Sequence, residues 1–120
     1  MTLKEQGEVV HASNHSELLT IVNETKNRLV IVDFYANWCS PCVHFKPKYS
    51  VLAKEYVNKA VFVKVDIDET PESSQFFAVN ALPTFGVFFN GKEQMKCEGA
   101  LEEKLRSVID STIAKLNLLL

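Results

Sequence analysis

The run Leu29–Tyr35 is the feature that most constrains how this chain can fold. Its seven residues, Leu-Val-Ile-Val-Asp-Phe-Tyr, are almost all apolar and are rich in β-branched side chains. A strand with one face in water alternates apolar and polar residues, whereas a nearly continuous apolar run suits a strand that is covered on both faces. Because helices must cover such a strand on either side, the sequence predicts an α/β fold with this strand near its centre.

The segments before and after this run alternate between strand and helix patterns. Asn14 and Glu17 form a capping pair at one helix start, and Asn90-Gly91 is the preferred pair for a tight hairpin turn. Strands are predicted over residues 9–11, 60–67, 84–89 and 94–97, and helices over residues 14–22, 40–56, 70–77 and 101–116. This order predicts a single domain over residues 1–120, with a mixed, parallel and antiparallel, five-stranded sheet between helices.

Length, charge and cysteine count exclude several classes of protein. A chain of 120 residues can bury a core without disulfides, and a net charge of −2 gives no electrostatic basis for binding nucleic acid or an anionic membrane. No apolar run approaches the ~18 residues of a membrane span. Residues 1–6 are polar and lack an apolar signal segment, and three cysteines are an odd number for a secreted disulfide framework. We therefore expect a cytoplasmic monomer.

Cys39 and Cys42 carry the reactive chemistry of the sequence. They lie three residues apart, where a buried strand ends and a helix begins. Unpaired N–H groups and the helix dipole favour an anion at a helix start, so Cys39 is predicted to be an attacking thiolate. Cys42, one turn further in, would then resolve the mixed disulfide formed on Cys39. Pro41 would make the turn rigid, and Trp38 would offer a flat apolar surface beside the sulfur.

Zinc binding and inert cysteines are the alternatives for this pair. One C-x-x-C supplies two zinc ligands, and His44 and Cys97 are the nearest candidates for the others. No second pair stands at finger-like spacing, and Pro41 restricts a chelating loop. Cys97 shares the less polar face of its predicted strand with Met95, which indicates a buried thiol, with a regulatory thiol as the alternative.

Asp33 interrupts the apolar run and needs an explanation of its own. A carboxylate at such a position costs free energy unless it marks a hydrated strand end or takes part in function. In the functional interpretation it lies beneath the cysteines, burial raises its pKa, and it accepts the proton of Cys42.

Several motifs together resemble the thioredoxin family over about residues 8–116. They are the run Val32–Cys42, Pro47, Lys64–Asp68, Ala81–Phe85, Phe89–Gly91 and Gly99-Ala100. The resemblance implies the thioredoxin fold, reduction of protein disulfides through Cys39 and Cys42, and the proton-accepting role of Asp33. It further implies that Lys64 lies near Asp33 and modulates its charge, and that Pro83 follows a cis peptide bond opposite the cysteines.

The resemblance also implies a binding surface and partners. Trp38, Leu82, Pro83, Gly99 and Ala100 would border a shallow apolar groove, in which the outward-facing backbone of Leu82 pairs with an extended substrate segment. Tyr35 is either part of this border or a core residue. The partners would be disulfide-containing proteins and a thioredoxin reductase that supplies electrons from NADPH, with no cofactor bound to the chain itself.

Ser40 is the residue at which the reactive centre departs from the family, which usually has glycine there. The potential is expected near that of thioredoxin, about −270 mV, with a shift of unknown sign from the serine. Disulfide isomerases usually carry histidine at the position of Pro41, so an isomerase-like oxidant is one alternative function. A non-catalytic binding module is another, although such modules often lack one of the two cysteines.

Overall fold

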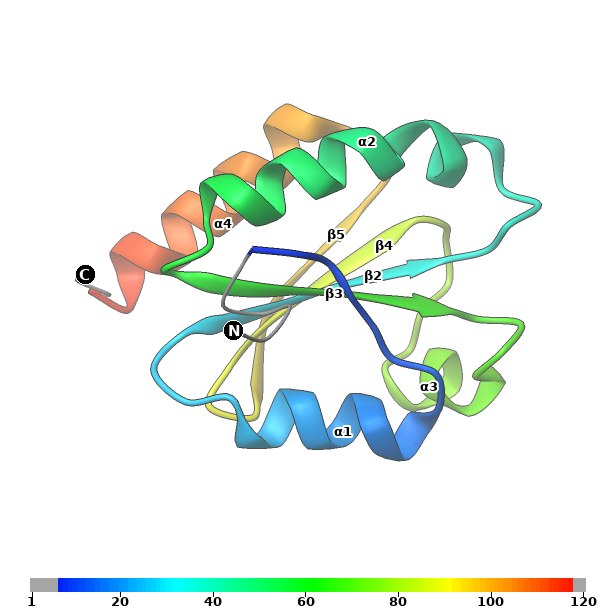
Figure 1. Cartoon of the computed structure of the whole chain (residues 1–120), viewed down its shortest axis with the longest axis horizontal. Helices are drawn as coiled ribbons and strands as arrows, with labels where there is room; N and C mark the ends of the chain where they lie inside the picture. Colours follow the sequence, from blue (N-terminus) through cyan, green and yellow to red (C-terminus); the bar gives the residue numbers. More distant parts are fainter. Residues whose placement is uncertain (1–6, 118–120) are drawn as a thin grey trace.

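Five strands form one mixed sheet between two layers of helices. The computed structural model describes residues 7–117 (Figure 1). In chain order the elements are β1 (Val10–His11), α1 (His15–Glu24), β2 (Leu29–Tyr35), α2 (Ser40–Glu55), β3 (Ala60–Asp66), α3 (Pro71–Phe76), β4 (Thr84–Phe89), β5 (Lys92–Glu98) and α4 (Glu102–Lys115). Residues 1–6, the polar segment at the start of the sequence, and residues 118–120 lie outside the described residues.

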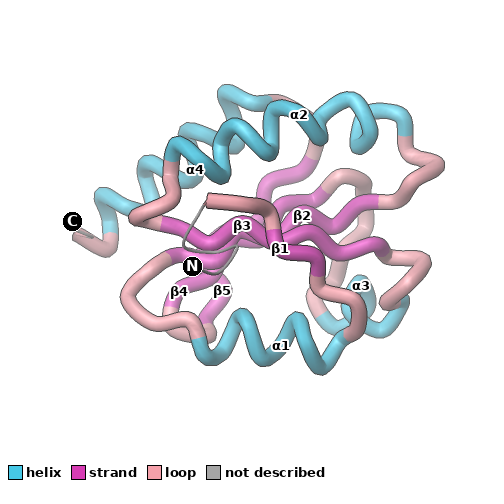
Figure 2. The backbone as a smooth tube through the Cα atoms, viewed as in Figure 1, coloured by secondary structure: helices cyan, strands magenta, loops and turns pink. Residues whose placement is uncertain are grey.

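The strands lie in the order β1-β3-β2-β4-β5, with β2 at the centre (Figure 2). β1 and β2 run parallel to β3, whereas β4 runs antiparallel to β2 and to β5. In this register Asp33 lies between Lys64 of β3 and Phe85 of β4. All seven residues of β2 are buried. The predicted α/β architecture, with a mixed five-stranded sheet and helices on both faces, is confirmed.

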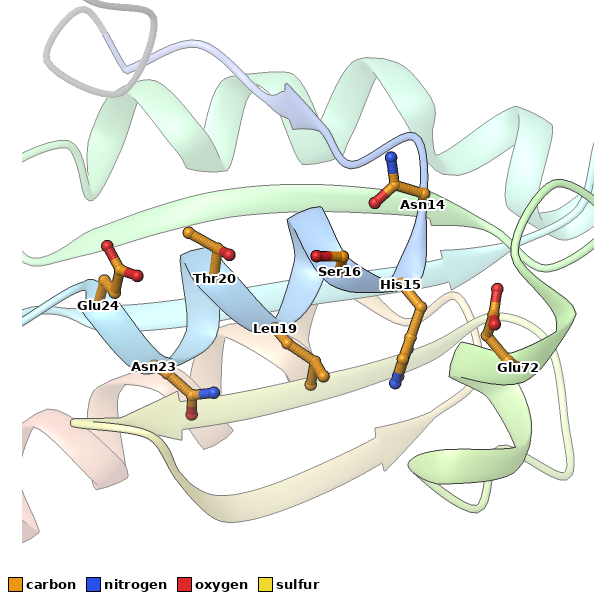
Figure 3. A pocket seen from close by; sticks show the side chains of 8 residues that line it. All are labelled: Asn14, His15, Ser16, Leu19, Thr20, Asn23, Glu24 and Glu72. Carbon is orange, nitrogen blue, oxygen red and sulfur yellow. The ribbon is translucent and has the colours of Figure 1, made fainter.

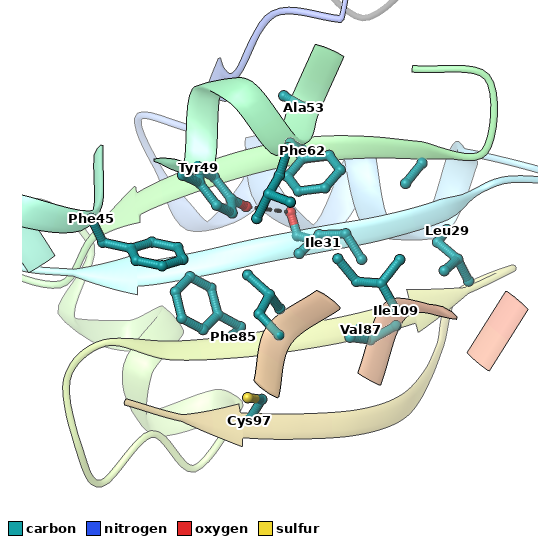
Figure 4. Close-up of a cluster of buried hydrophobic side chains, with 13 residues drawn as sticks. Leu29, Ile31, Phe45, Tyr49, Ala53, Phe62, Phe85, Val87, Cys97 and Ile109 are labelled. Carbon is teal, nitrogen blue, oxygen red and sulfur yellow. Dashed lines mark hydrogen bonds between the residues drawn. The ribbon is translucent and has the colours of Figure 1, made fainter. Parts of the chain in front are cut away.

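Side chains of β2 alternate between two cores. Leu29 and Ile31 belong to a cluster that also contains Leu52, Phe85 and Leu105 (Figure 4). This cluster lies on the face of the sheet that α2 and α4 cover (Figure 1). Val30, Val32 and Phe34 point to the other face, where they pack with Leu18 and Val22 of α1 and with Phe77. The single proton of the Tyr49 hydroxyl is shared between the carbonyl oxygens of Val63, at 2.7 Å, and Ile31, at 3.0 Å, and this contact fixes α2 to the sheet.

Local signals in the sequence explain where these elements begin. The side chain of Asn14 accepts a hydrogen bond from the backbone N–H of Glu17 at 2.8 Å, which confirms the Asn14 half of the predicted capping pair. The carboxylate of Glu17 accepts the N–H of Ser13, at 3.4 Å, rather than that of Asn14. Asn90 and Gly91 have φ values of 50° and 84°, the pair of positive values that a tight hairpin turn of this kind requires. Because the turn takes only these two residues, β5 begins at Lys92, two residues earlier than predicted. Within residues 7–117, no helix is long and apolar enough to cross a membrane.

Candidate active site

The turn between β2 and α2 holds the cysteine pair. The backbone N–H of Cys39 donates to the carbonyl oxygen of Ala36 at 3.2 Å, which closes the turn after the strand. Cys39 is the N-cap of α2, and its sulfur accepts the backbone N–H of Cys42 at 3.3 Å. The two residues are joined by a disulfide, with their Cα atoms 5.3 Å apart. The same N–H group would stabilise a thiolate on Cys39 once the disulfide is reduced.

The two sulfurs differ in their access to solvent. Cys39 is 7% exposed and Cys42 is 1% exposed. Both belong to a small buried cluster with Tyr35 and Ala36, against which Ile67 and Leu82 pack. Cys39 is therefore the member of the pair that an incoming sulfur can reach.

A hollow of about 510 Å³ opens beside Cys39. Its other lining residues are Trp38, Pro41, Ile67, Ser74, Val79, Asn80, Ala81 and Leu82. The indole of Trp38 is 69% exposed, and its Nε1–H donates to a carboxylate oxygen of Asp68 at 2.8 Å. This hydrogen bond holds a large apolar surface beside the reactive sulfur, where a partner protein can contact it.

The residues predicted to border the groove are only partly brought together here. Trp38 and Leu82 line the hollow, whereas Gly99 and Ala100 do not. Pro83 is buried, its peptide bond with Leu82 is cis as predicted, and its carbonyl oxygen accepts the backbone N–H of Gly99 at 2.9 Å. Gly99 thus lies beside Pro83, and Ala100 lines a separate hollow near Leu101.

Asp33 is buried in β2 and shares a cavity with residues from the middle of α2. It is 5% exposed, and its Oδ1 atom is buried without a hydrogen-bond partner among residues 7–117. Burial raises the pKa of Asp33 from 3.8 to about 7, although the charges of Lys64 and Lys46 lower it in part. The carboxyl can therefore take up or release a proton near neutral pH, which no ordinary aspartate does.

A second, smaller cavity of about 160 Å³ leads to this carboxyl. It is lined by Val9, Asp33, Tyr35, Lys46, Tyr49, Ser50 and Lys64. Lys64 comes from the sheet and lies next to Asp33 in the register, whereas Lys46 comes from α2. Neither lysine forms an ion pair with Asp33 among the ion pairs of the described residues. The cavity is large enough to admit water to the carboxylate.

The chain was compared with known families, curated proteins and solved structures. The family model described as thioredoxin matches residues 8–111. The chain belongs to the thioredoxin family. It is 37% identical to thioredoxin 1 of Plasmodium falciparum, over 85% of this chain and 95% of that protein, and 35% identical to thioredoxin H4 of Arabidopsis thaliana, over 88% and 90%. The Fasciola hepatica thioredoxin structure matches with a TM-score of 0.81 and 40% identity, over 85% of this chain and 97% of that one.

Membership of the thioredoxin family gives the Cys39–Cys42 disulfide its meaning. The pair stands at the active-site position of a family of disulfide reductases, so this chain is a thiol–disulfide oxidoreductase. Among residues 7–117, no group of three histidine, cysteine or acidic side chains could hold a metal ion. Ser40, the departure from the family pattern, is exposed at the first position of α2.

Cys97 and the three histidines lie apart from this thioredoxin centre. Cys97 is 2% exposed within the core under α2 and α4 (Figure 4), and burial raises the pKa of its thiol, as expected for a buried strand cysteine. His11 contacts Glu69 on the surface, and His44 is exposed on α2. His15 lines another hollow, together with other residues of α1 and with Glu72 of α3 (Figure 3). Neither active-site cysteine lines this hollow.

Sequence reasoning missed one wall of the main hollow and one side of the Asp33 cavity. Ile67 follows β3, the parallel neighbour of β2, and ligands bind where parallel strands end at one edge. That rule could have found Ile67. Lys46 lies four residues after Cys42, and residues at this spacing share a helix face. Val79 and Asn80 had no comparable signal, since a loop has no fixed period.

Proposed function

We propose that this chain reduces protein disulfides by two successive thiol transfers. The Cys39 thiolate attacks one sulfur of a target disulfide, forms a mixed disulfide and releases the first target sulfur as a thiolate. Cys42 then loses its proton, attacks the Cys39 sulfur, breaks the mixed disulfide and releases the second target sulfur. Two electrons pass from the dithiol to the target, and the reaction leaves Cys39 and Cys42 joined by a disulfide.

The observation that carries this proposal is the asymmetry of the pair. Cys39 borders the hollow and caps α2, while Cys42 is buried behind it. An accessible thiolate can start an exchange, and a shielded thiol is well placed to finish it, because the sulfur of Cys39, with which it forms the disulfide, lies within its reach.

Asp33 is proposed to accept the proton of Cys42 in the second transfer. A carboxyl with a pKa of about 7 is matched to proton transfer at neutral pH, whereas one near 3.8 would be a weak base. Lys64 is proposed to favour the ionised carboxylate, since its charge lowers the pKa of Asp33. Trp38, Leu82 and Pro83 would hold the target segment against Cys39.

The partners are proposed from the same chemistry. Each turnover leaves a disulfide, so a second protein must return two electrons; a thioredoxin reductase that oxidises NADPH would do this without a cofactor bound to this chain. The location is proposed to be the cytoplasm, where a reducing environment suits a recycled dithiol and the buried thiol of Cys97.

A turnover assay with insulin tests the proposal. The purified protein should reduce insulin disulfides with NADPH and a thioredoxin reductase, and Cys39→Ser and Cys42→Ser should each abolish turnover. Cys42→Ser should also accumulate a mixed disulfide with insulin on a non-reducing gel, whereas Cys39→Ser should not. Full turnover of either variant would refute the two-step scheme. A measured potential near −180 mV rather than about −270 mV would indicate an isomerase-like oxidant instead.

A further inference from the structure

Lys46 shares a face of α2 with the resolving cysteine. It lies four residues after Cys42, and Tyr49 and Ser50 continue the same face one turn further on. Lys46, Tyr49 and Ser50 all line the cavity that leads to Asp33. The helix that presents Cys42 therefore also supplies one wall of the path to the carboxyl.

Charged and titratable groups reach this cavity from three elements. Lys46 and Tyr49 come from α2, Lys64 comes from β3, and Tyr35 comes from β2 itself. The hydroxyl proton of Tyr49 is shared between two backbone carbonyl oxygens, so the ring is held in place by the sheet. Phe85, which pairs with Asp33 from β4, and Val9 are apolar. Two cations thus act on Asp33: Lys64 from the sheet and Lys46 from the helix.

The ammonium group of Lys46 lies over an aromatic ring. This group lies 5.6 Å from the centre of the Tyr35 ring, within the range of a cation–π contact. Lys46 is exposed, and this contact favours a position of its ammonium group beside Tyr35, which also lines the Asp33 cavity. Tyr35 in turn packs in the cluster that contains both cysteines.

From this geometry we propose that Lys46 is a positioning residue for the second thiol transfer: held over Tyr35, it keeps Asp33 ionised at the moment when Cys42 must give up its proton. The inference rests on the proposed role of Asp33. In the protein, Lys64 supplies a fixed charge from the sheet, and Lys46 supplies a charge from the helix that carries the reacting thiol.

The test compares Lys46→Met with Lys48→Met. Both lysines are exposed on α2, but Lys48 does not line the Asp33 cavity. A chromogenic aromatic disulfide releases one coloured thiolate in each transfer, so the second absorbance phase in stopped flow reports the resolution step. Without the Lys46 charge, the pH midpoint of that phase should rise, and its rate near neutral pH should fall, because a smaller fraction of Asp33 is ionised there. Lys48→Met should leave both unchanged, and Lys46→Arg should restore the midpoint.

Two further measurements separate this inference from the proposed function. The titration of the Asp33 carboxyl, followed by carbon NMR in the oxidised protein, should move upward in Lys46→Met and not in Lys48→Met. In an Asp33→Asn background, Lys46→Met should have no further effect on the second phase. If Asp33→Asn slows that phase but Lys46→Met moves neither the midpoint nor the NMR titration, the inference about Lys46 is wrong and the role of Asp33 stands. If Asp33→Asn leaves the phase unchanged, the role of Asp33 is wrong, and with it the inference.

Discussion

The buried carboxyl of Asp33 should make the stability of the folded protein depend on pH in an unusual direction. Its pKa is about 7 in the folded protein and 3.8 as an ordinary aspartate. Between these two values the folded state keeps a proton that the unfolded state has lost, so the free energy of unfolding falls as pH rises. The contribution of the protonated carboxyl is complete below 3.8, declines through this window and is lost above about 7.

The size of the effect follows from the same two values. Each tenfold change in proton affinity corresponds to about 1.36 kcal/mol, so ionised Asp33 should destabilise the folded state by about 4 kcal/mol above pH 7. Asp33 is 5% exposed, so solvent screens little of this cost. The variant Asp33→Asn cannot ionise. The difference in unfolding free energy between Asp33→Asn and the parent protein should therefore increase by about 4 kcal/mol, in favour of the variant, from about pH 4 to about pH 8.5.

Urea unfolding of both oxidised proteins at these two pH values measures the difference directly. The change in the stability gap between the two pH values isolates ionisation, because a fixed packing or hydrogen-bond effect of asparagine is the same at both. A gap that stays constant to within about 1 kcal/mol would show that Asp33 titrates normally, and the reasoning from burial would be refuted.

Three other substitutions test separate features of the chain. Asn14→Ala removes the cap of α1 and should cost about 1 kcal/mol of unfolding free energy in urea. Leu105→Ala opens a void in the core under α4, where Leu105 is fully buried, and should cost about 2–5 kcal/mol by the same method. Ser40→Gly changes an exposed residue, so its redox potential, measured against glutathione, should stay within about 30 mV of the parent value, equivalent to about 1.4 kcal/mol. A larger shift would show that the serine hydroxyl acts on the sulfurs.

Elements with strong local signals could be predicted from the sequence. β2 spans the same seven residues as the apolar run, because a strand buried on both faces needs apolar side chains along its length. Asp33 is the exception. The hairpin was predictable from Asn90-Gly91, since few other pairs adopt two positive φ values. The start of β5 was not, because Lys92 and Glu93 are polar residues on an edge strand and have no apolar pattern to mark them.

The site could be predicted to the extent that it is local in the chain. Cys39, Cys42 and Trp38 stand together in the sequence, and the helix start that activates Cys39 follows from the strand before it. The hollow beside Cys39 depends on how a loop after α3 packs, and no periodic pattern carries that information. Gly99 therefore lies beside Pro83 rather than in the hollow, a result of backbone pairing between distant segments.

The placement of Asp33 explains why β2 departs from an apolar pattern at one position. A chain selected for stability alone would gain by replacing a carboxyl that has no partner for Oδ1 among the described residues. Lys46 and Lys64, which line the cavity between β2 and α2, would have no carboxylate to stabilise if position 33 were apolar. The stability cost builds up between pH 3.8 and about 7 and is complete above about 7, the pH range in which Asp33 is ionised and could act as a base. The cost and the proposed function are therefore two consequences of one desolvated carboxyl.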